Sequence, residues 1–246
     1  MRHKLLRISS KDRDDKKDST SNFSVNVNNV GDCQKVRSIV VKQVSIPFTF
    51  YNINASNNRF TWKKTGVNTS FVLPVGQYNV SSFMAAMQAE GTAIGLTMVQ
   101  NPLTRRFTIT TTTTIEYLDI RENVLAEVLG IKYGEMPVEE VLVFNATGVP
   151  ALSITSNVFI ESNSLGDVNL IRTSGHSRST LACIPITVPW GVVEQYVSSH
   201  SEIDDIDHNT HGGKSVQHID IRITDHNGVV VDLNGHHVSI ILVLYY

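Results

Sequence analysis

The amino-acid sequence predicts an all-β protein, built as an antiparallel β sandwich with two short helices in its connecting loops. About ten short segments are rich in β-branched and aromatic residues, and turn residues separate them about every 8–12 residues. Only two segments place apolar residues at helical spacing. A chain of 246 residues can bury a sizeable core without disulfide bonds or metal ions.

The longest predicted strand runs from Val36 to Ile53. Its even positions carry mostly apolar residues and share one face of an extended chain, whereas the odd face carries the polar residues Arg37, Gln43, Ser45 and Thr49, with Ile39 and Val41 in its middle. This pattern indicates a strand covered on both faces at its centre. Pro47 cannot donate a ladder hydrogen bond, so we expect an edge, a bend or a bulge there.

Residues 1–20 are rich in charges of both signs and nearly devoid of apolar residues after Ile8. Such a segment cannot build a core, and we predict a flexible N-terminal arm preceding a sandwich domain over 21–246. The arm either stays solvated or becomes ordered on a neighbouring subunit or an internal polyanion. Its candidate contact residues are Arg2, Lys4, Arg7, Lys11 and Arg13.

Local patterns predict the remaining elements. Helices are expected over 80–90, where Asn79 or Ser81 would cap the N-terminus, and over 121–129, where Gly130 would provide a left-handed cap. We expect Phe83, Met84 and Met87 to pack onto the sandwich. Strands are expected over 21–27, 59–63, 69–73, 96–100, 105–110, 141–144, 152–161, 168–172, 179–187, 216–224, 229–233 and 238–246. The last of these is apolar on both faces and must lie inside a sheet.

Composition restricts the possible functions. The formal net charge of -2 gives the body of the protein no general attraction to nucleic acid. Of the two cysteines, Cys183 lies in an apolar strand and is expected to be a buried thiol, which fits a reducing compartment. No signal peptide or membrane-spanning run is visible, so we expect a soluble protein made in the cytosol.

No pattern in the sequence indicates catalysis or a bound cofactor. Seven of the nine histidines fall between His200 and His237, around a polar segment at 204–213. That segment fails the EF-hand spacing, because Thr210 and Val216 stand where glycine and glutamate are needed. We find no His-x-His pair, phosphate loop, dinucleotide fingerprint or nucleophile elbow. The sequence therefore predicts a protein that is not an enzyme and has no catalytic or metal-binding residues.

The segment Ile184–Tyr196 is unusually apolar for a stretch interrupted by two prolines and a glycine. It either folds back to fill the core or forms a contact between subunits, where aromatic residues contribute much of the binding energy. The candidate interface residues are Trp190, Val192, Val193 and Tyr196.

Several stretches together resemble the penton proteins, or minor capsid proteins, of double-jelly-roll DNA viruses such as virophages and polinton-like viruses. They are SNFSVNVNN followed by VKQVSIPFTFYNI, then VGQYNVSSFMAAM, the succession FTI…LAEVLGI, and the closing IDIRITDHNGVVVDLNGHHVSIILVLYY. This resemblance covers residues 21–246 and implies a single jelly roll.

The resemblance also implies a function in the virion. Such a protein assembles inside the infected host cell as a homopentamer that closes the icosahedral five-fold vertices. Its partners would be its own copies and the trimeric double-jelly-roll major capsid protein, and genome contact would be possible only through the N-terminal arm. The alternative is a receptor-attachment or spike-type binding module on the same scaffold, which predicts a trimer or a grooved monomer.

Overall fold

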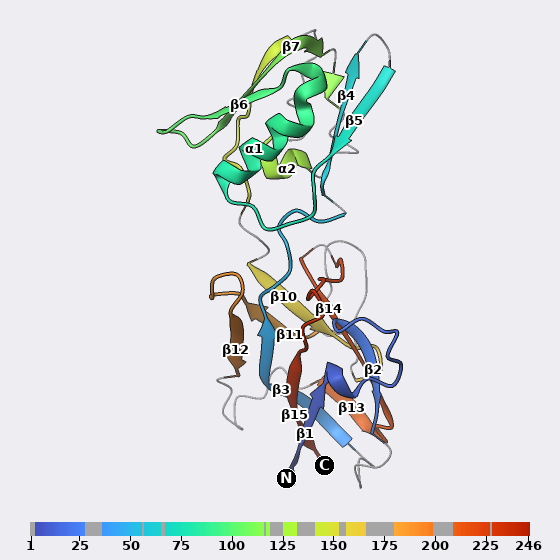
Figure 1. Ribbon diagram of the computed structural model, residues 1–246. Helices are drawn as coiled ribbons and strands as arrows, with labels where there is room; N and C mark the ends of the chain where they lie inside the picture. Colours follow the sequence, from blue (N-terminus) through green and yellow to red (C-terminus); the bar gives the residue numbers. More distant parts are fainter. Residues whose placement is uncertain are drawn as a thin grey trace. The chain divides into compact units, whose positions relative to one another are not determined.

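The computed structural model describes residues 3–27, 36–55, 57–64, 67–115, 117–118, 125–131, 141–152, 156–165, 180–198, 209–226 and 228–246. The chain divides into two compact units, each with its own strands (Figure 1). Unit 1 consists of Met1–Phe50 and Thr155–Tyr246, and unit 2 of Tyr51–Ile154. The sequence predicted one continuous domain over 21–246, whereas the structure inserts unit 2 between the halves of the sandwich. No change of composition marks the two boundaries of unit 2, at residues 50–51 and 154–155.

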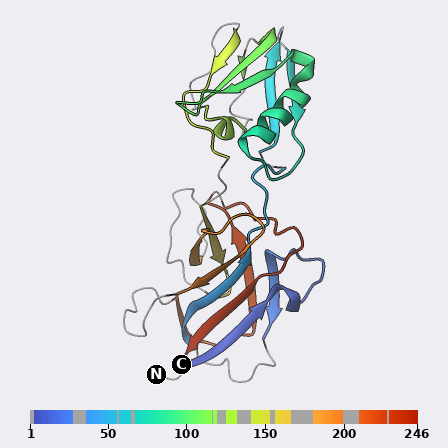
Figure 2. The ribbon, with the colours of Figure 1, turned by 60° about the vertical axis from the view of Figure 1, so that its left-hand side comes forward.

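The described residues of unit 1 form two antiparallel sheets. The first has the order β1 (His3–Ser9), β15 (Ser239–Tyr245), β3 (Val36–Pro47) and β12 (Val193–Val197), and β13 (Asn209–Lys214) also pairs with β3. Figure 2 shows β1, β15 and β3 side by side. The second has the order β11 (Thr180–Pro185), β10 (Asn157–Glu161), β14 (His218–Thr224) and β2 (Asn22–Asn26). Apolar residues that alternate along these strands form the buried core of unit 1, including Ile8, Phe23, Val44, Ile160, Ile221 and Leu242. This is the predicted all-β jelly-roll sandwich.

A bulge in β3 explains why both of its faces look apolar in the sequence. The consecutive residues Ile241 and Leu242 of β15 pair with Gln43 and Val41, so Lys42 is one extra residue in β3. An extra residue reverses which face the following side chains occupy. Ile39 and Val41 are therefore buried before the bulge, and Val44 and Ile46 after it.

The N-terminal segment differs from the predicted flexible arm. His3–Ser9 forms β1, and all seven of its residues pair with β15, from His3 opposite Tyr245 to Ser9 opposite Ser239. Leu6 and Ile8 are buried, and Ser10–Asp12 forms the short 3-10 helix η1. The pairing partner lies more than two hundred residues away in the sequence, so local composition does not reveal it. The prediction that the last strand lies inside a sheet is confirmed, since β15 lies between β1 and β3.

In the part of unit 2 that the structure describes, there are two small antiparallel sheets and the two α-helices. One sheet has the order β5 (Val67–Val72), β4 (Arg59–Lys64) and β8 (Tyr117–Leu118), and the other β6 (Thr97–Gln100), β7 (Phe107–Ile115) and β9 (Val141–Asn145). The helices are α1 (Val80–Glu90), which the 3-10 helix η2 (Gly91–Ile94) follows, and α2 (Leu125–Leu129). Asn79 accepts a hydrogen bond from the Ser82 N–H at 2.9 Å, so the predicted cap of α1 is confirmed.

Unit 2 has a core of its own. Phe83 and Met87 of α1 are fully buried among Phe60, Phe107 and Leu129, and Met84 packs against this cluster. These side chains therefore pack inside unit 2, and the expectation that they cover the sandwich is wrong. Gly130 has a φ of +74°, as predicted for a left-handed cap after α2.

Three further expectations have different outcomes. Cys183 of β11 is exposed, because β11 is an edge strand and the residue faces away from the core, so the prediction of a buried thiol is wrong. Residues 229–233 form a single bridge, Thr224 to Val230, where a full strand was expected. The strand predicted over 168–172 lies outside the described residues.

Candidate functional site

The edge strand β12 and the loop before it carry an exposed apolar surface on unit 1. β12 pairs with the end of β3, from Val193 opposite Pro47 to Val197 opposite Gln43. The relative exposures are 43% for Trp190, 45% for Val192, 44% for Val193 and 58% for Val197. We call these four residues the apolar edge. An exposed apolar edge strand is a preferred place for another chain to bind.

The exposure of the apolar edge counts against one of the two interpretations of Ile184–Tyr196, and the subunit contact stays a prediction. Trp190, Val192 and Val193 do not fill the core, so the core-filling alternative is wrong for them. Tyr196 is half-buried and alternates with the exposed valines of β12, which places it on the opposite face. Val197 is part of the exposed surface, but it was not among the interface residues predicted from the sequence. The alternation of Val193 and Val197 around Gln195 was the signal that could have identified it.

Glu194 organises the loop that carries Trp190. Its buried carboxylate accepts hydrogen bonds at Oε2 from the Thr187 N–H (2.6 Å), the Thr187 hydroxyl (2.9 Å) and the Val188 N–H (3.2 Å). Burial opposes ionisation, but these donors prevail and hold the pKa of Glu194 below its ordinary value. Gly191, at a φ of +88°, donates its N–H to the Phe48 carbonyl at 2.7 Å. The loop is therefore fixed at both ends.

Four of the five basic residues predicted to act from a flexible arm lie in the described part of the chain. Arg13 closes a turn, donating to the carbonyl of Ser10 at 2.8 Å and to that of Lys16 at 3.3 Å. Lys4 lies in β1 opposite Leu244, and Arg2 is outside the described residues. Arg7 and Lys11 are exposed, and both line a groove on unit 1.

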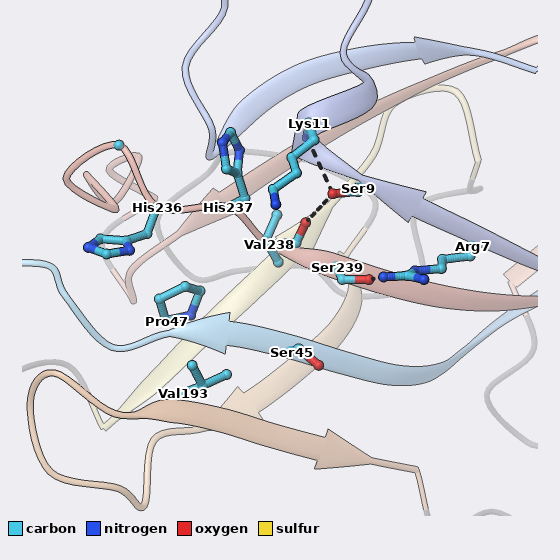
Figure 3. Close-up of a pocket in the computed structure, with 11 residues that line it drawn as sticks. Arg7, Ser9, Lys11, Ser45, Pro47, Val193, His236, His237, Val238 and Ser239 are labelled. Atoms are coloured by element: carbon cyan, nitrogen blue, oxygen red, sulfur yellow. Dashed lines mark hydrogen bonds between the residues drawn. The ribbon is translucent and has the colours of Figure 1, made fainter.

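This groove brings residues of the two predicted sets together. It has a volume of about 380 Å³, and Arg7, Lys11, Val193, His236 and His237 are among its lining residues (Figure 3). The hydroxyl-bearing residues Ser9, Ser45 and Ser239 also line it, together with Pro47, Gly235 and Val238. We call it the basic groove. It follows the surface from β1 across β15 and β3 to β12, so it joins the apolar edge at Val193.

The electrostatic character of the basic groove is positive. None of the described residues that line it is acidic. Arg7 donates its Nε–H to the Ser239 hydroxyl at 3.4 Å, and His237 Nδ1 lies 3.1 Å from the Ser10 hydroxyl. Burial lowers the pKa of His237. The pKa is lowered further by nearby basic groups, because a positive charge on His237 would be repelled by them; these groups are Lys11, Arg13, Lys16 and His236. The arrangement can attract an anionic group.

The described residues provide no evidence of metal binding or membrane insertion. Among them, no three histidine, cysteine or acidic side chains form a group that could hold a metal ion. Residues 204–208 of the polar histidine-rich segment lie outside the described part of the chain. No helix in the described ranges is long and apolar enough to cross a bilayer.

The fold defines a class of all-β proteins built on a jelly-roll sandwich. The crystal structure of the penton protein of mavirus is similar to this chain, with a TM-score of 0.51 and 12% sequence identity. The similarity covers 99% of this chain and 99% of the mavirus chain. No family model matches the sequence, and no curated protein does. At this identity the comparison demonstrates a shared fold.

Proposed function

We propose that this protein is a minor capsid protein, and that homopentamers of it close the five-fold vertices of an icosahedral DNA virus. The observation that carries the proposal is the similarity to a viral penton protein over the full length of both chains. A likeness restricted to the sandwich would be weak support, because jelly rolls have many functions. Here the similarity also covers the inserted unit 2.

The apolar edge supports self-association. Three of its four residues are valines, which lose little side-chain entropy when they are buried, and the fourth is a tryptophan, a residue type enriched at binding hot spots. The loop is already fixed by Glu194 and Gly191, so binding does not require it to become ordered. We propose Trp190, Val192, Val193 and Tyr196 as contacts between adjacent copies in the pentamer, together with Val197.

The proposed location is the capsid vertex of a virion assembled in the infected cell. The trimeric double-jelly-roll major capsid protein would surround each pentamer. Since β1 is a strand of the sheet, the predicted arm contacts would act from that fixed position. Genome contact is confined in this proposal to the basic residues of the N-terminal segment.

Unit 2 supports a second candidate, a receptor-attachment module. Leu103 is 92% exposed at the turn between β6 and β7, beside the exposed residues Arg105 and Arg106. An exposed apolar side chain followed closely by two cations at the tip of a hairpin is suited to contact a partner. An attachment module of the spike type predicts a trimer.

Light scattering of the purified protein across a concentration series distinguishes these candidates. The proposal expects a species of five times 27.3 kDa to become populated as the concentration rises. A stable trimer would contradict it and favour the attachment module.

A further inference from the structure

We propose that the basic groove is a docking site for a protein segment that presents carboxylate side chains next to small apolar residues. This inference extends the proposed function, because it states the chemistry of a partner that would bind beside the apolar edge. Its test, however, requires no oligomer.

The described lining of the basic groove carries positive charge and no negative charge. Arg7 and Lys11 are exposed cations from β1 and η1, and His236 and His237 add two imidazoles from the turn before β15. In Figure 3 the Lys11 side chain extends toward Val238, and the Arg7 side chain approaches Ser239. Among the described residues, no carboxylate from the lining neutralises these groups. A carboxylate on a partner would therefore gain charge-assisted hydrogen bonds without displacing an internal ion pair.

The hydrogen-bond donors of the basic groove suit a carboxylate. A guanidinium has five N–H donors in a planar fork, which matches the two oxygens of a carboxylate. The hydrogen bond from Arg7 to Ser239, at 3.4 Å, is long for a charged donor, so a carboxylate can replace it at little cost. The Ser45 hydroxyl donates to the Gln195 side chain at 2.7 Å, which fixes the wall of the groove nearest β12.

The apolar part of the groove lining favours a protein segment over nucleic acid. The wall beside β12 is formed by Pro47 and Val193, and Val193 belongs to the apolar edge. A phosphate backbone gains nothing from an apolar wall. An acidic segment with apolar neighbours can contact the cations Arg7 and Lys11 and the apolar residues Pro47 and Val193 at the same time. Nucleic-acid binding also depends on many phosphate contacts, whereas the described lining of the groove offers two permanent cations, Arg7 and Lys11. The volume of about 380 Å³ accommodates a few side chains of a peptide.

The test is a titration of the full-length protein, below the concentration at which it associates, with capped peptides. The acidic peptide is acetyl-Val-Glu-Val-Glu-Val-amide, and its control replaces both glutamates with glutamine. Amide resonances in 1H–15N spectra report the location of binding. We expect the acidic peptide to shift the resonances of Ser9, Lys11 and Ser239, and the glutamine peptide to bind at least tenfold more weakly. Equal binding of the two peptides would overturn the proposal.

Protein variants complete the experiment. Arg7→Gln and Lys11→Gln, made separately, should each weaken binding of the acidic peptide by about tenfold, as expected for loss of a charged hydrogen-bonding partner. Lys17→Gln is the matched control, because Lys17 is exposed in the same segment but does not line the groove. It should change the affinity by less than about twofold. An equal effect of all three substitutions would refute a defined site, as would tighter binding of inorganic phosphate or a single-stranded oligonucleotide. A pentamer that forms without peptide binding would contradict this inference alone.

Discussion

The Glu194 carboxylate accepts a 2.6 Å hydrogen bond from the Thr187 N–H, across the loop that carries Trp190. This contact links the buried side of β12 to the start of the loop that carries Trp190. The same oxygen accepts two further hydrogen bonds, from the Thr187 hydroxyl and the Val188 N–H. The shape of the proposed subunit contact therefore depends on one buried carboxylate.

Replacing Glu194 should destabilise unit 1. Glu194→Gln retains an acceptor but removes the charge, and we expect a loss of about 1–2 kcal/mol in the free energy of unfolding. The pKa of Glu194 is lowered in the folded state, so its contribution is present above the unfolded pKa and is lost as pH falls through the folded pKa. Urea unfolding at pH 7 and pH 3 measures both effects, and the variant should differ less from wild type at pH 3. The exposed Glu90 provides the control Glu90→Gln, and equal effects of both substitutions would contradict the role of Glu194.

Trp190→Ala should weaken self-association and leave the fold intact. Trp190 is 43% exposed in the isolated chain, so its removal creates no large cavity, whereas truncation of an interface tryptophan costs about 2 kcal/mol or more. Sedimentation velocity across a concentration series measures association, and thermal unfolding measures stability. The control is Leu103→Ala on unit 2, where the side chain is 92% exposed. A much lower melting temperature with unchanged association would show that the tryptophan stabilises the fold instead.

His237 should make the stability of unit 1 depend on pH near neutrality. Burial and the nearby cations Lys11, Arg13, Lys16 and His236 lower its pKa in the folded state. The unfolded chain then binds more protons, so stability is complete above the unfolded pKa, about 6.5, and declines as pH falls through the folded pKa. Urea unfolding between pH 7.5 and pH 5 should show this decline, and His237→Gln should reduce it. If exposed His226→Gln reduces the decline equally, the assignment to His237 is wrong.

Gly130 should be among the most sensitive positions of unit 2. It has a φ of +74°, and a Cβ placed there would lie 2.5 Å from the carbonyl oxygen of Gly148. Gly130→Ala therefore combines left-handed strain, about 1–2 kcal/mol, with a clash against backbone. Gly235 has a similar φ of +77°, but an added Cβ meets nothing within 4 Å. Chemical denaturation should show Gly130→Ala to be the more destabilising substitution, and equal losses would contradict the importance of the contact with Gly148.

Much of the fold could be predicted, because alternating apolar residues and turn signals are local. The bounds of α1 follow from Asn79 and Gly91, and the internal position of β15 follows from its two apolar faces. Long-range pairings could not be predicted in this way. β1 has the alternating apolar residues Leu6 and Ile8, but its charged neighbours conceal that it pairs with the C-terminal strand. The bulge at Lys42 depends on the register between β3 and β15, which neither strand encodes alone.

The candidate site shows the same limit. The apolar edge could be found from the sequence because its residues are contiguous and too apolar for a loop. The basic groove could not, since Arg7 and Val193 are brought together only by the order of β1, β15, β3 and β12. From the sequence, Arg7 and Lys11 were predicted only as contact residues of a flexible N-terminal arm. In the structure these two cations share a groove with the apolar residues Pro47 and Val193. This combination is the basis of the preference for an acidic segment that we propose.

Five-fold self-association is the central claim, and electron microscopy of the purified protein tests it most directly. Class averages of negatively stained particles, prepared above the association concentration, should show rings with five-fold rotational symmetry that Trp190→Ala disperses. Rings with three-fold symmetry, or single particles at every concentration and in the presence of a crowding agent, would contradict the account.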